Sequence, residues 1–280
     1  MSAENLRVSR MHESSLDLMK RSGRSRRLTL RFAQLKELLV ATGALVAALC
    51  AASTAEAQSS NWSGFYLGGN IGGAWGSQRT DVQAADWLYD PLFPPFIASA
   101  GSSKSSPSNF TGGAQAGWNW QSQGFVWGLE GDIRALSLAS HSDTGYIKDP
   151  YFQADSRFLE MTKIEWLATL RGRAGIPLGG ALLYGTAGLA FGAVKSTYNY
   201  NVLYYGYDSH GAASTVATGW TAGAGVELPL SAKWTVGVQY LRFDLGSVNY
   251  QSKDKASFYH EKISASMLGD LVTATLNYRF

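Results

Sequence analysis

Apolar and polar residues alternate along most of the chain after about residue 58. The alternation recurs in eight stretches of about nine to thirteen residues, and a period of two is that of a β-strand with one apolar face. The apolar sets fall within residues 65–75, 114–120, 125–133, 166–176, 183–191, 220–228, 234–240 and 272–280. The pattern predicts eight strands. After residue 58, no stretch approaches the roughly twenty apolar residues of a membrane-spanning helix.

Short and long connections alternate between these strands. Residues 121–124, 177–180 and 229–233 form short connections, whereas about 33, 28, 25 and 22 residues separate the other strand pairs. Aromatic residues gather near both ends of the strands, as in the two girdles of membrane barrels. We therefore predict an all-β fold: an eight-stranded antiparallel up-and-down transmembrane β-barrel with short periplasmic turns and four long outer loops.

Charged residues on the strands share the parity opposite to the apolar residues. We expect them to face the barrel lumen, because an Arg on the lipid face near the bilayer centre would cost roughly 2 to 4 kcal/mol. The predicted lumen charge network consists of Glu130, Asp132, Arg134, Glu165, Arg171, Arg173, Glu227 and Arg279. An eight-stranded barrel is just wide enough for side chains to fill it, so opposite charges would pair there. This predicts a plugged interior and not a pore.

A secreted soluble sandwich or a lipocalin-like barrel is the alternative fold. In such a protein the apolar parity would simply form the core. The other parity, however, carries glycine and charge together, which favours the membrane barrel. Arg242 and Asp270 share the lipid parity, and since each lies beyond the last apolar residue on the loop side, we expect them among lipid headgroups.

Residues 1–57 have the features of a cleaved signal peptide. Basic residues precede an apolar run of about fifteen residues at 38–52, and Ala55-Glu56-Ala57 supplies small residues for cleavage after Ala57. Met19 is a second candidate for the start of translation. A twin-arginine signal at Ser25-Arg26-Arg27 is disfavoured, because that route exports folded proteins. The expected domains are the signal peptide at 1–57 and the barrel at 58–280.

The single cysteine, Cys50, lies in this leader, so the remaining chain offers no disulfide, thiolate nucleophile or cysteine metal ligand. The leader also carries most of the excess positive charge. Without it, fifteen Lys and Arg residues face sixteen Asp and Glu residues. The basic isoelectric point therefore belongs to the leader and does not indicate a nucleic-acid partner.

Several glycine- and aromatic-rich segments carry a family resemblance. They are NWSGFYLGGNIGGAWG at 61–76, GGAQAGWNW at 112–120, LRGRAG at 170–175, YGTAGLA at 184–190 and the closing residues LNYRF. These segments resemble the porin-family outer-membrane β-barrel proteins of alphaproteobacteria, often labelled outer-membrane immunogenic or opacity-type proteins. The resemblance implies an integral surface protein of the Gram-negative outer membrane, with no catalytic motif.

The closing residues also resemble the signal that the barrel-assembly machinery reads during biogenesis, with Tyr278 and Phe280 as its aromatic positions. This makes that machinery an expected partner. The outer-membrane lipid bilayer and lipopolysaccharide are the other expected partners.

Histidines are the main candidates for chemistry outside the lumen. His141, His210 and His260 fall in three different outer loops without the spacing of a metal site, so we expect no metal and no cofactor. His141 with Ser137, Ser140 and Asp143 has the composition of a lipid-modifying site at an outer rim. Spacing alone does not place a nucleophile beside a base. We expect no enzymatic activity and keep a lipid-modifying enzyme as an alternative.

Two outer loops are rich in aromatic residues. The first contains Trp87 to Phe96, and the third contains Tyr198, Tyr200, Tyr204, Tyr205 and Tyr207. Exposed aromatics can form a recognition surface for a host or surface ligand. They can equally pack on one another and extend the strands above the membrane. The sequence thus predicts a protein that contributes to envelope structure and presents its loops for recognition, with a narrow diffusion porin as the main alternative.

Overall fold

A computed structural model describes residues 61–85, 93–149, 153–204, 206–254 and 260–280, which belong to one compact unit, Glu56–Phe280. The predicted leader, its cleavage site and Cys50 lie outside the described residues. So do residues 86–92 of the first aromatic loop and Tyr205 of the third. No helix in the described part is long and apolar enough to cross a bilayer.

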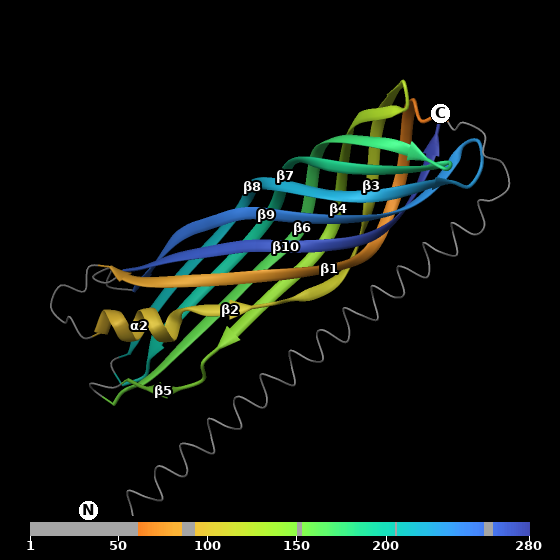
Figure 1. Ribbon diagram of the computed structural model, residues 1–280. Coiled ribbons are helices and arrows are strands. Elements are labelled where there is room, and N and C mark those ends of the chain that lie inside the picture. Colours follow the sequence, from red (N-terminus) through yellow and green to blue (C-terminus); the bar gives the residue numbers. More distant parts are fainter. Residues whose placement is uncertain (1–60, 86–92, 150–152, 205, 255–259) are drawn as a thin grey trace, which may run out of the picture. The chain divides into compact units, whose positions relative to one another are not determined.

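Eight long antiparallel strands form a closed ring in which β1 pairs with β10 (Figure 1). They are β1 (Gly64–Ala85), β3 (Ser108–Ser122), β4 (Phe125–Asp143), β6 (Asp155–Leu178), β7 (Ala181–Val202), β8 (Tyr207–Pro229), β9 (Trp234–Asp254) and β10 (His260–Arg279). Two short strands, β2 (Ser103–Ser105) and β5 (Ile147–Lys148), pair with β1 and β6. The predicted eight-stranded up-and-down barrel is confirmed.

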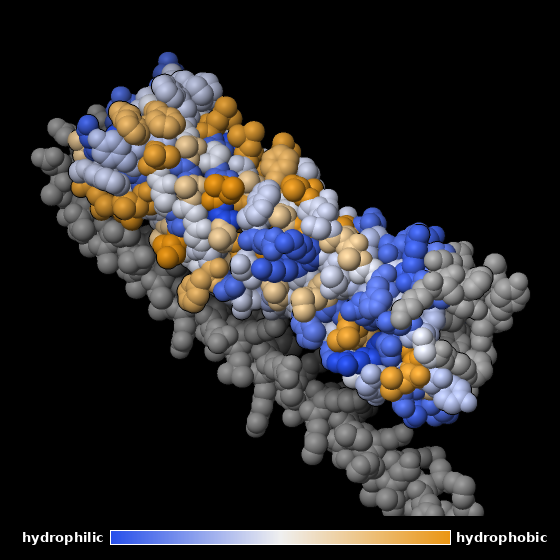
Figure 2. Space-filling view, turned by 180° about the vertical axis from the view of Figure 1, so that it is seen from behind, coloured by the Kyte–Doolittle hydropathy of each residue, from blue (hydrophilic) through white to orange (hydrophobic). Residues whose placement is uncertain are grey.

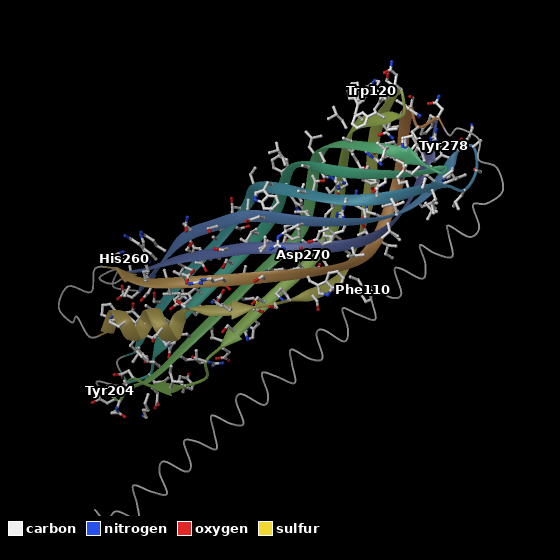
Figure 3. The ribbon with its side chains drawn as sticks, in the orientation of Figure 1. Phe110, Trp120, Tyr204, His260, Asp270 and Tyr278 are labelled. Atoms are coloured by element: carbon white, nitrogen blue, oxygen red, sulfur yellow. The ribbon has the colours of Figure 1, made fainter. Side chains whose placement is uncertain are left out.

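The barrel has two distinct ends. We call the end with the short connections 123–124, 179–180 and 230–233 the base, and the opposite end the tip. Trp120 and Tyr278 lie at the base, His260 and Tyr204 at the tip, and Phe110 and Asp270 between them (Figure 3). The helix α2 (Phe93–Gly101) lies at the tip and carries the chain from β1 towards β2.

The strands extend well beyond the part expected from the sequence. A membrane strand needs about 9–11 residues, whereas β6 has 24. Most of the third predicted loop is strand, and only residues 203–206 separate β7 from β8. The first connection contains α2 and β2, and the second contains β5. The predicted outer loops are therefore largely a continuation of the barrel wall.

The outer surface separates into an apolar zone and a polar zone. Towards the base the outward side chains are apolar, and Ile71 exposes 68 % of its surface. Above Trp75, Trp166 and Trp220 the outward residues of the strands are mainly polar or charged. Figure 2 shows hydrophobic residues gathered over the end that carries the C-terminus and hydrophilic residues towards the other end. The apolar zone and its aromatic borders fit a bilayer core and its two interfaces.

Side chains fill the interior in successive layers. A polar layer near the base contains most of the predicted charges. Above it lies an apolar layer built from Leu136, Leu138, Ile164, Leu167, Leu241, Phe243 and others. Near the tip a third layer combines Phe158, Tyr198, Tyr200 and Ile263 with Ile97 of α2, which is fully buried. The upper parts of the strands therefore enclose a core of their own.

Candidate functional site

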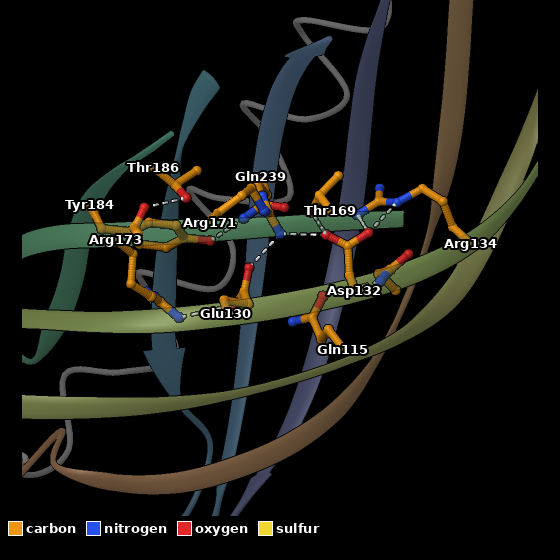
Figure 4. A network of polar contacts seen from close by, with 12 residues as sticks. Gln115, Glu130, Asp132, Arg134, Thr169, Arg171, Arg173, Tyr184, Thr186 and Gln239 are labelled. Atoms are coloured by element: carbon orange, nitrogen blue, oxygen red, sulfur yellow. Dashed lines mark hydrogen bonds and ion pairs between the residues drawn. The ribbon is translucent and has the colours of Figure 1, made fainter. Parts of the chain in front are cut away.

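The buried charges near the base form one connected network (Figure 4). Glu130 on β4 lies directly opposite Arg171 on β6. Arg171 Nη2 donates hydrogen bonds to Glu130 Oε1 at 2.5 Å and to Asp132 Oδ2 at 2.7 Å. Asp132 also accepts from Arg134 Nε at 2.8 Å and from the hydroxyl of Thr169. Two strands thus hold a chain of alternating charge.

Arg173 connects this chain to β8 and to two tyrosines. Its Nη2 atom donates to Glu227 Oε1 at 2.7 Å, and its Nη1 atom donates to the Tyr66 hydroxyl at 2.8 Å. The Tyr66 hydroxyl in turn donates to Glu130 Oε2 at 2.5 Å. The guanidinium carbon of Arg173 lies 3.9 Å from the centre of the Tyr184 ring, a cation–π contact.

Amide side chains extend the polar layer around the remaining strands. Asn70 donates to Gln115 at 3.1 Å, and Gln115 donates to Asn277 at 2.8 Å, which links β1, β3 and β10. On the other side, Gln239 of β9 donates to the Tyr184 hydroxyl at 3.0 Å. The layer therefore ties together strands that are far apart in the sequence.

The network is neutral and buried. Its three carboxylates and three guanidinium groups are all at least 94 % buried, because none of the six residues exposes more than 6 % of its surface. Buried charges are tolerated only when they are paired and hydrogen-bonded, and here each carboxylate contacts at least one guanidinium. Chemically, such an arrangement fixes the strands relative to one another and fills the space between them.

Six of the predicted lumen residues lie in this network: Glu130, Asp132, Arg134, Arg171, Arg173 and Glu227. Arg279 is half-buried nearer the base, where its guanidinium lies 5.3 Å from the Trp62 ring and forms no ion pair with the described residues. Tyr278 and Phe280 lie on the outer face at the base, with ring centres 5.1 Å apart. Their role in assembly stays a prediction.

The structure corrects the predicted direction of Glu165, because its side chain lies outside the barrel. A β-bulge interrupts the pairing of β6 with β7 between Ile164 and Leu167, so both of these residues face inward and Glu165 faces outward. Its carboxylate lies 3.0 Å from Lys195 Nζ and 3.6 Å from Lys163 Nζ on the outer surface. The simple alternation used to predict its direction fails at the bulge.

The histidine candidates do not assemble with the residues proposed beside them. His141 faces outward, whereas Ser140, its neighbour in the chain, is buried inside the barrel. Asp143 binds Arg157 instead, at 2.6 Å. Among the residues that the structure describes, no cluster of three or more His, Cys, Asp or Glu side chains is suited to hold a metal ion.

Buried carboxylates near the tip, Glu160 and Glu261 among them, were not predicted. Glu160 accepts hydrogen bonds from the hydroxyls of Thr80 and Ser103, and Glu261 accepts from Ser209 at 2.7 Å and from other hydroxyls. The alternation continues through these segments, but its inward positions mix charged, polar and aromatic residues. Their outward positions are polar too, so the apolar belt that revealed the lower strands is absent there.

A polar core enclosed by an apolar belt is the arrangement of an outer-membrane barrel. The model of the family described as "Outer membrane protein beta-barrel domain" matches residues 43–280. The chain belongs to this family. Proteins with similar sequences include the 31 kDa outer-membrane immunogenic protein of Brucella melitensis, which is 33 % identical over 86 % of this chain and 93 % of the relative. The localisation in the outer membrane follows.

A second relative of this barrel is the 22 kDa outer membrane protein of Rhizobium leguminosarum bv. viciae, with 32 % identity over 69 % of this chain and 67 % of the relative. Among solved structures, Neisserial surface protein A covers 78 % of this chain and 98 % of its own, with 11 % identity and a TM-score of 0.34. The outer membrane protease OmpT of Escherichia coli covers 81 % of this chain and 100 % of its own, with 8 % identity and a TM-score of 0.42.

Proposed function

We propose that this barrel is a closed surface protein that contributes to envelope structure and presents its tip for recognition. The observation that carries the proposal is the filled interior. A solute moving along the barrel axis would meet the neutral charge network and then a layer of apolar side chains. An apolar constriction opposes the passage of ions, because an ion there loses its hydration without gaining a partner.

The tip supports the second half of the proposal. The helix α2 packs Ile97 into the upper core and Phe96 against Phe158, with ring centres 5.9 Å apart. The same upper core includes Val202 of β7, two residues before Tyr204, which exposes 81 % of its surface. Surface residues held on a rigid scaffold are suited to recognition.

Single-channel conductance tests the closed interior. The full protein would be purified from outer membranes and added to a planar bilayer, with a known porin as positive control. A gel shift between boiled and unboiled samples would show that the barrel is folded. We expect no steady openings from the folded protein. Reproducible openings of fixed size would contradict the closed interior and make a narrow diffusion porin the function.

Deletion of residues 93–101 tests recognition by the tip. We expect cells that produce this variant to attach less well to cultured epithelial cells than cells with the unaltered protein, while the gel shift still reports a folded barrel. Equal attachment of the two strains would contradict a recognition role for the α2 side of the tip.

A further inference from the structure

The barrel wall is open between β8 and β9 in its upper half. Residues 211–219 of β8 and 245–252 of β9, all of them described, form no backbone pairs with each other. Residues 211–219 remain paired with β7, and residues 247–252 remain paired with β10. Both strands can be followed in Figure 1. The barrel therefore contains two facing strand edges whose groove-side backbone donors and acceptors do not pair with each other.

A groove of about 500 Å³ lies along this opening, lined by residues 213–218 and 245–249. We call it the β8–β9 groove. Its floor is apolar, because Ala217, Leu245 and Val248 belong to the buried apolar layer. On the inner side of the opening, the Tyr250 hydroxyl of β9 forms a hydrogen bond of 2.8 Å with the Ser196 hydroxyl of β7. The groove is thus a closed-bottomed depression and not a hole through the wall.

The opening is built into the chain at a β-bulge. Leu245 and Gly246 of β9 together oppose the single residue Met267 of β10. Gly246 has a φ of 67°, a left-handed conformation that glycine adopts without strain, and its N–H binds the Asp244 carboxylate at 2.8 Å. Because a bulge bends its strand and increases the local twist, it directs β9 away from the path of β8 at this point.

We propose that the β8–β9 groove binds an extended polypeptide segment, which pairs as an added strand with these edges. Unpaired strand edges are templates for this mode of binding, and backbone N–H and C=O groups require partners when they are covered. The open stretch of seven residues between Gly211 and Gly219 would accommodate a segment about 20 Å long.

The groove also indicates which segment it accepts. Its floor is apolar, while Ser214, Thr215 and Ser247 supply a polar rim, so a segment with alternating apolar and polar residues fits best. Lys262 lies opposite Gln251, so one exposed amine lies beside the β9 side of the groove, whereas Lys195, opposite Ser214, is already paired with Glu165. Acidic residues at the polar positions would complement this charge.

The polypeptide is favoured over a lipid by the position of the groove. It lies towards the tip from Trp220, which belongs to the outer aromatic border, and a polar rim does not suit an acyl chain. A detergent or lipid occupant is therefore an outcome that the test must separate from peptide binding.

Hydrogen exchange of the full protein in lipid nanodiscs gives the first test. The amides within 212–218 that face the groove should exchange at least tenfold faster than those of residues 194–200 on β7, which are paired on both sides. Exchange as slow as that of β7 would show that the two edges pair in solution and would overturn the proposal.

Peptide binding gives the second test. The probe is a fluorescein-labelled peptide of about six residues in which valine alternates with serine and glutamate, matching the length of the opening. We expect saturable binding by anisotropy and protection of the groove amides. A peptide with two central prolines should not bind, and one with lysine in place of glutamate should bind at least threefold more weakly. Absence of saturable binding by the glutamate peptide would overturn the proposal.

Two variants of the protein locate the bound peptide. Ser214→Trp places a bulky side chain in the groove, whereas Ala139→Trp places it on the exposed face of β4, above the apolar zone. Ser214→Trp should weaken binding at least tenfold, and Ala139→Trp should leave it unchanged, with both proteins folded by the gel-shift criterion. Equal binding by both variants would place the peptide elsewhere, and displacement of the peptide by added detergent would assign the groove to a lipid. Either result would overturn the proposal.

Discussion

Arg173 contacts carboxylates from two strands, Glu227 on β8 and Glu130 on β4. Replacing it with methionine keeps most of the volume and removes the charge, which leaves Glu227 buried without its 2.7 Å partner. Loss of one member of a buried ion pair typically costs about 3–5 kcal/mol. We expect Arg173→Met to lower the free energy of unfolding in lipid vesicles by about this amount, measured by urea titration of tryptophan fluorescence.

The exposed pair Arg79–Asp81 supplies a matched control, since its side chains expose 55 % and 41 % of their surface. Arg79→Met should change the free energy of unfolding by less than about 0.5 kcal/mol. The double variant Arg173→Met with Glu227→Gln should recover part of the loss. Equal effects of Arg173→Met and Arg79→Met would contradict a stabilising role of the buried network.

Asp143 provides a pH prediction at the tip. The hydrogen bond from Arg157, assisted by the Gly145 N–H, lowers the pKa of the Asp143 carboxyl from 3.8 to about 2. Because the folded pKa lies below the unfolded one, the stabilisation by this pair is present above pH 3.8 and is lost as the pH falls through about 2. Carboxyl carbon shifts in NMR spectra would measure this titration, and Arg157→Gln should return the pKa towards 3.8.

The direction of most strand charges was predictable from the sequence, but their partners were not. Alternate residues of a strand point to opposite faces, so the sequence alone places Glu130 and Arg171 on the face opposite to the lipid-facing residues. The pairing of Arg173 with Glu227, by contrast, depends on the register of β6, β7 and β8. Glu165 shows the limit of parity, because a bulge is not visible in a single strand's alternation.

The helix α2 closes the upper core through Ile97. We expect Ile97→Ala to destabilise this core by about 2–5 kcal/mol, because it leaves a cavity between α2 and the strands. The effect should be local: hydrogen exchange should increase in residues 156–160 and 198–202 and stay unchanged near the base. Ser99→Ala on the exposed side of α2 is the control. A uniform increase in the hydrogen-exchange rate along all strands would contradict a separate upper core.

The lower half of each strand was predictable, and the upper half was not. Near the base, lipid requires an apolar outer face, so the sequence shows strict alternation. Near the tip, both faces are varied: Phe158 and Thr162 face inward on β6 with Glu160 between them, and the outer face meets water. Because no apolar belt requires apolar and polar residues to alternate there, the sequence of the upper strands looks like that of loops.

The length of the strands places much of the wall outside the bilayer. The 24 residues of β6 correspond to about 60 Å along the barrel axis at the usual rise and tilt, whereas the apolar band of such barrels is about 25 Å tall. We therefore expect the wall to pass through the layer that lipopolysaccharide sugars would occupy, with only the tip beyond much of it.

Cysteine labelling on intact cells tests this arrangement. Tyr204→Cys at the tip should react with both a small maleimide and a maleimide that carries a long polyethylene glycol chain. Ala139→Cys on the wall should react well only with the small reagent, because neighbouring sugars exclude the large one. Equal reaction of both positions with the large reagent would contradict a wall embedded in the sugar layer.

The charge network also constrains the order in which the strands enter the membrane. β4 contributes two carboxylates and one guanidinium, β6 contributes two guanidinium groups, and β8 contributes one carboxylate. None of these strands is neutral within the network when taken alone, and only the three together balance. A strand that entered lipid ahead of the others would carry uncompensated charge across the hydrocarbon. Insertion is therefore expected to follow the association of β4 to β8, so that the membrane receives an already neutral sheet.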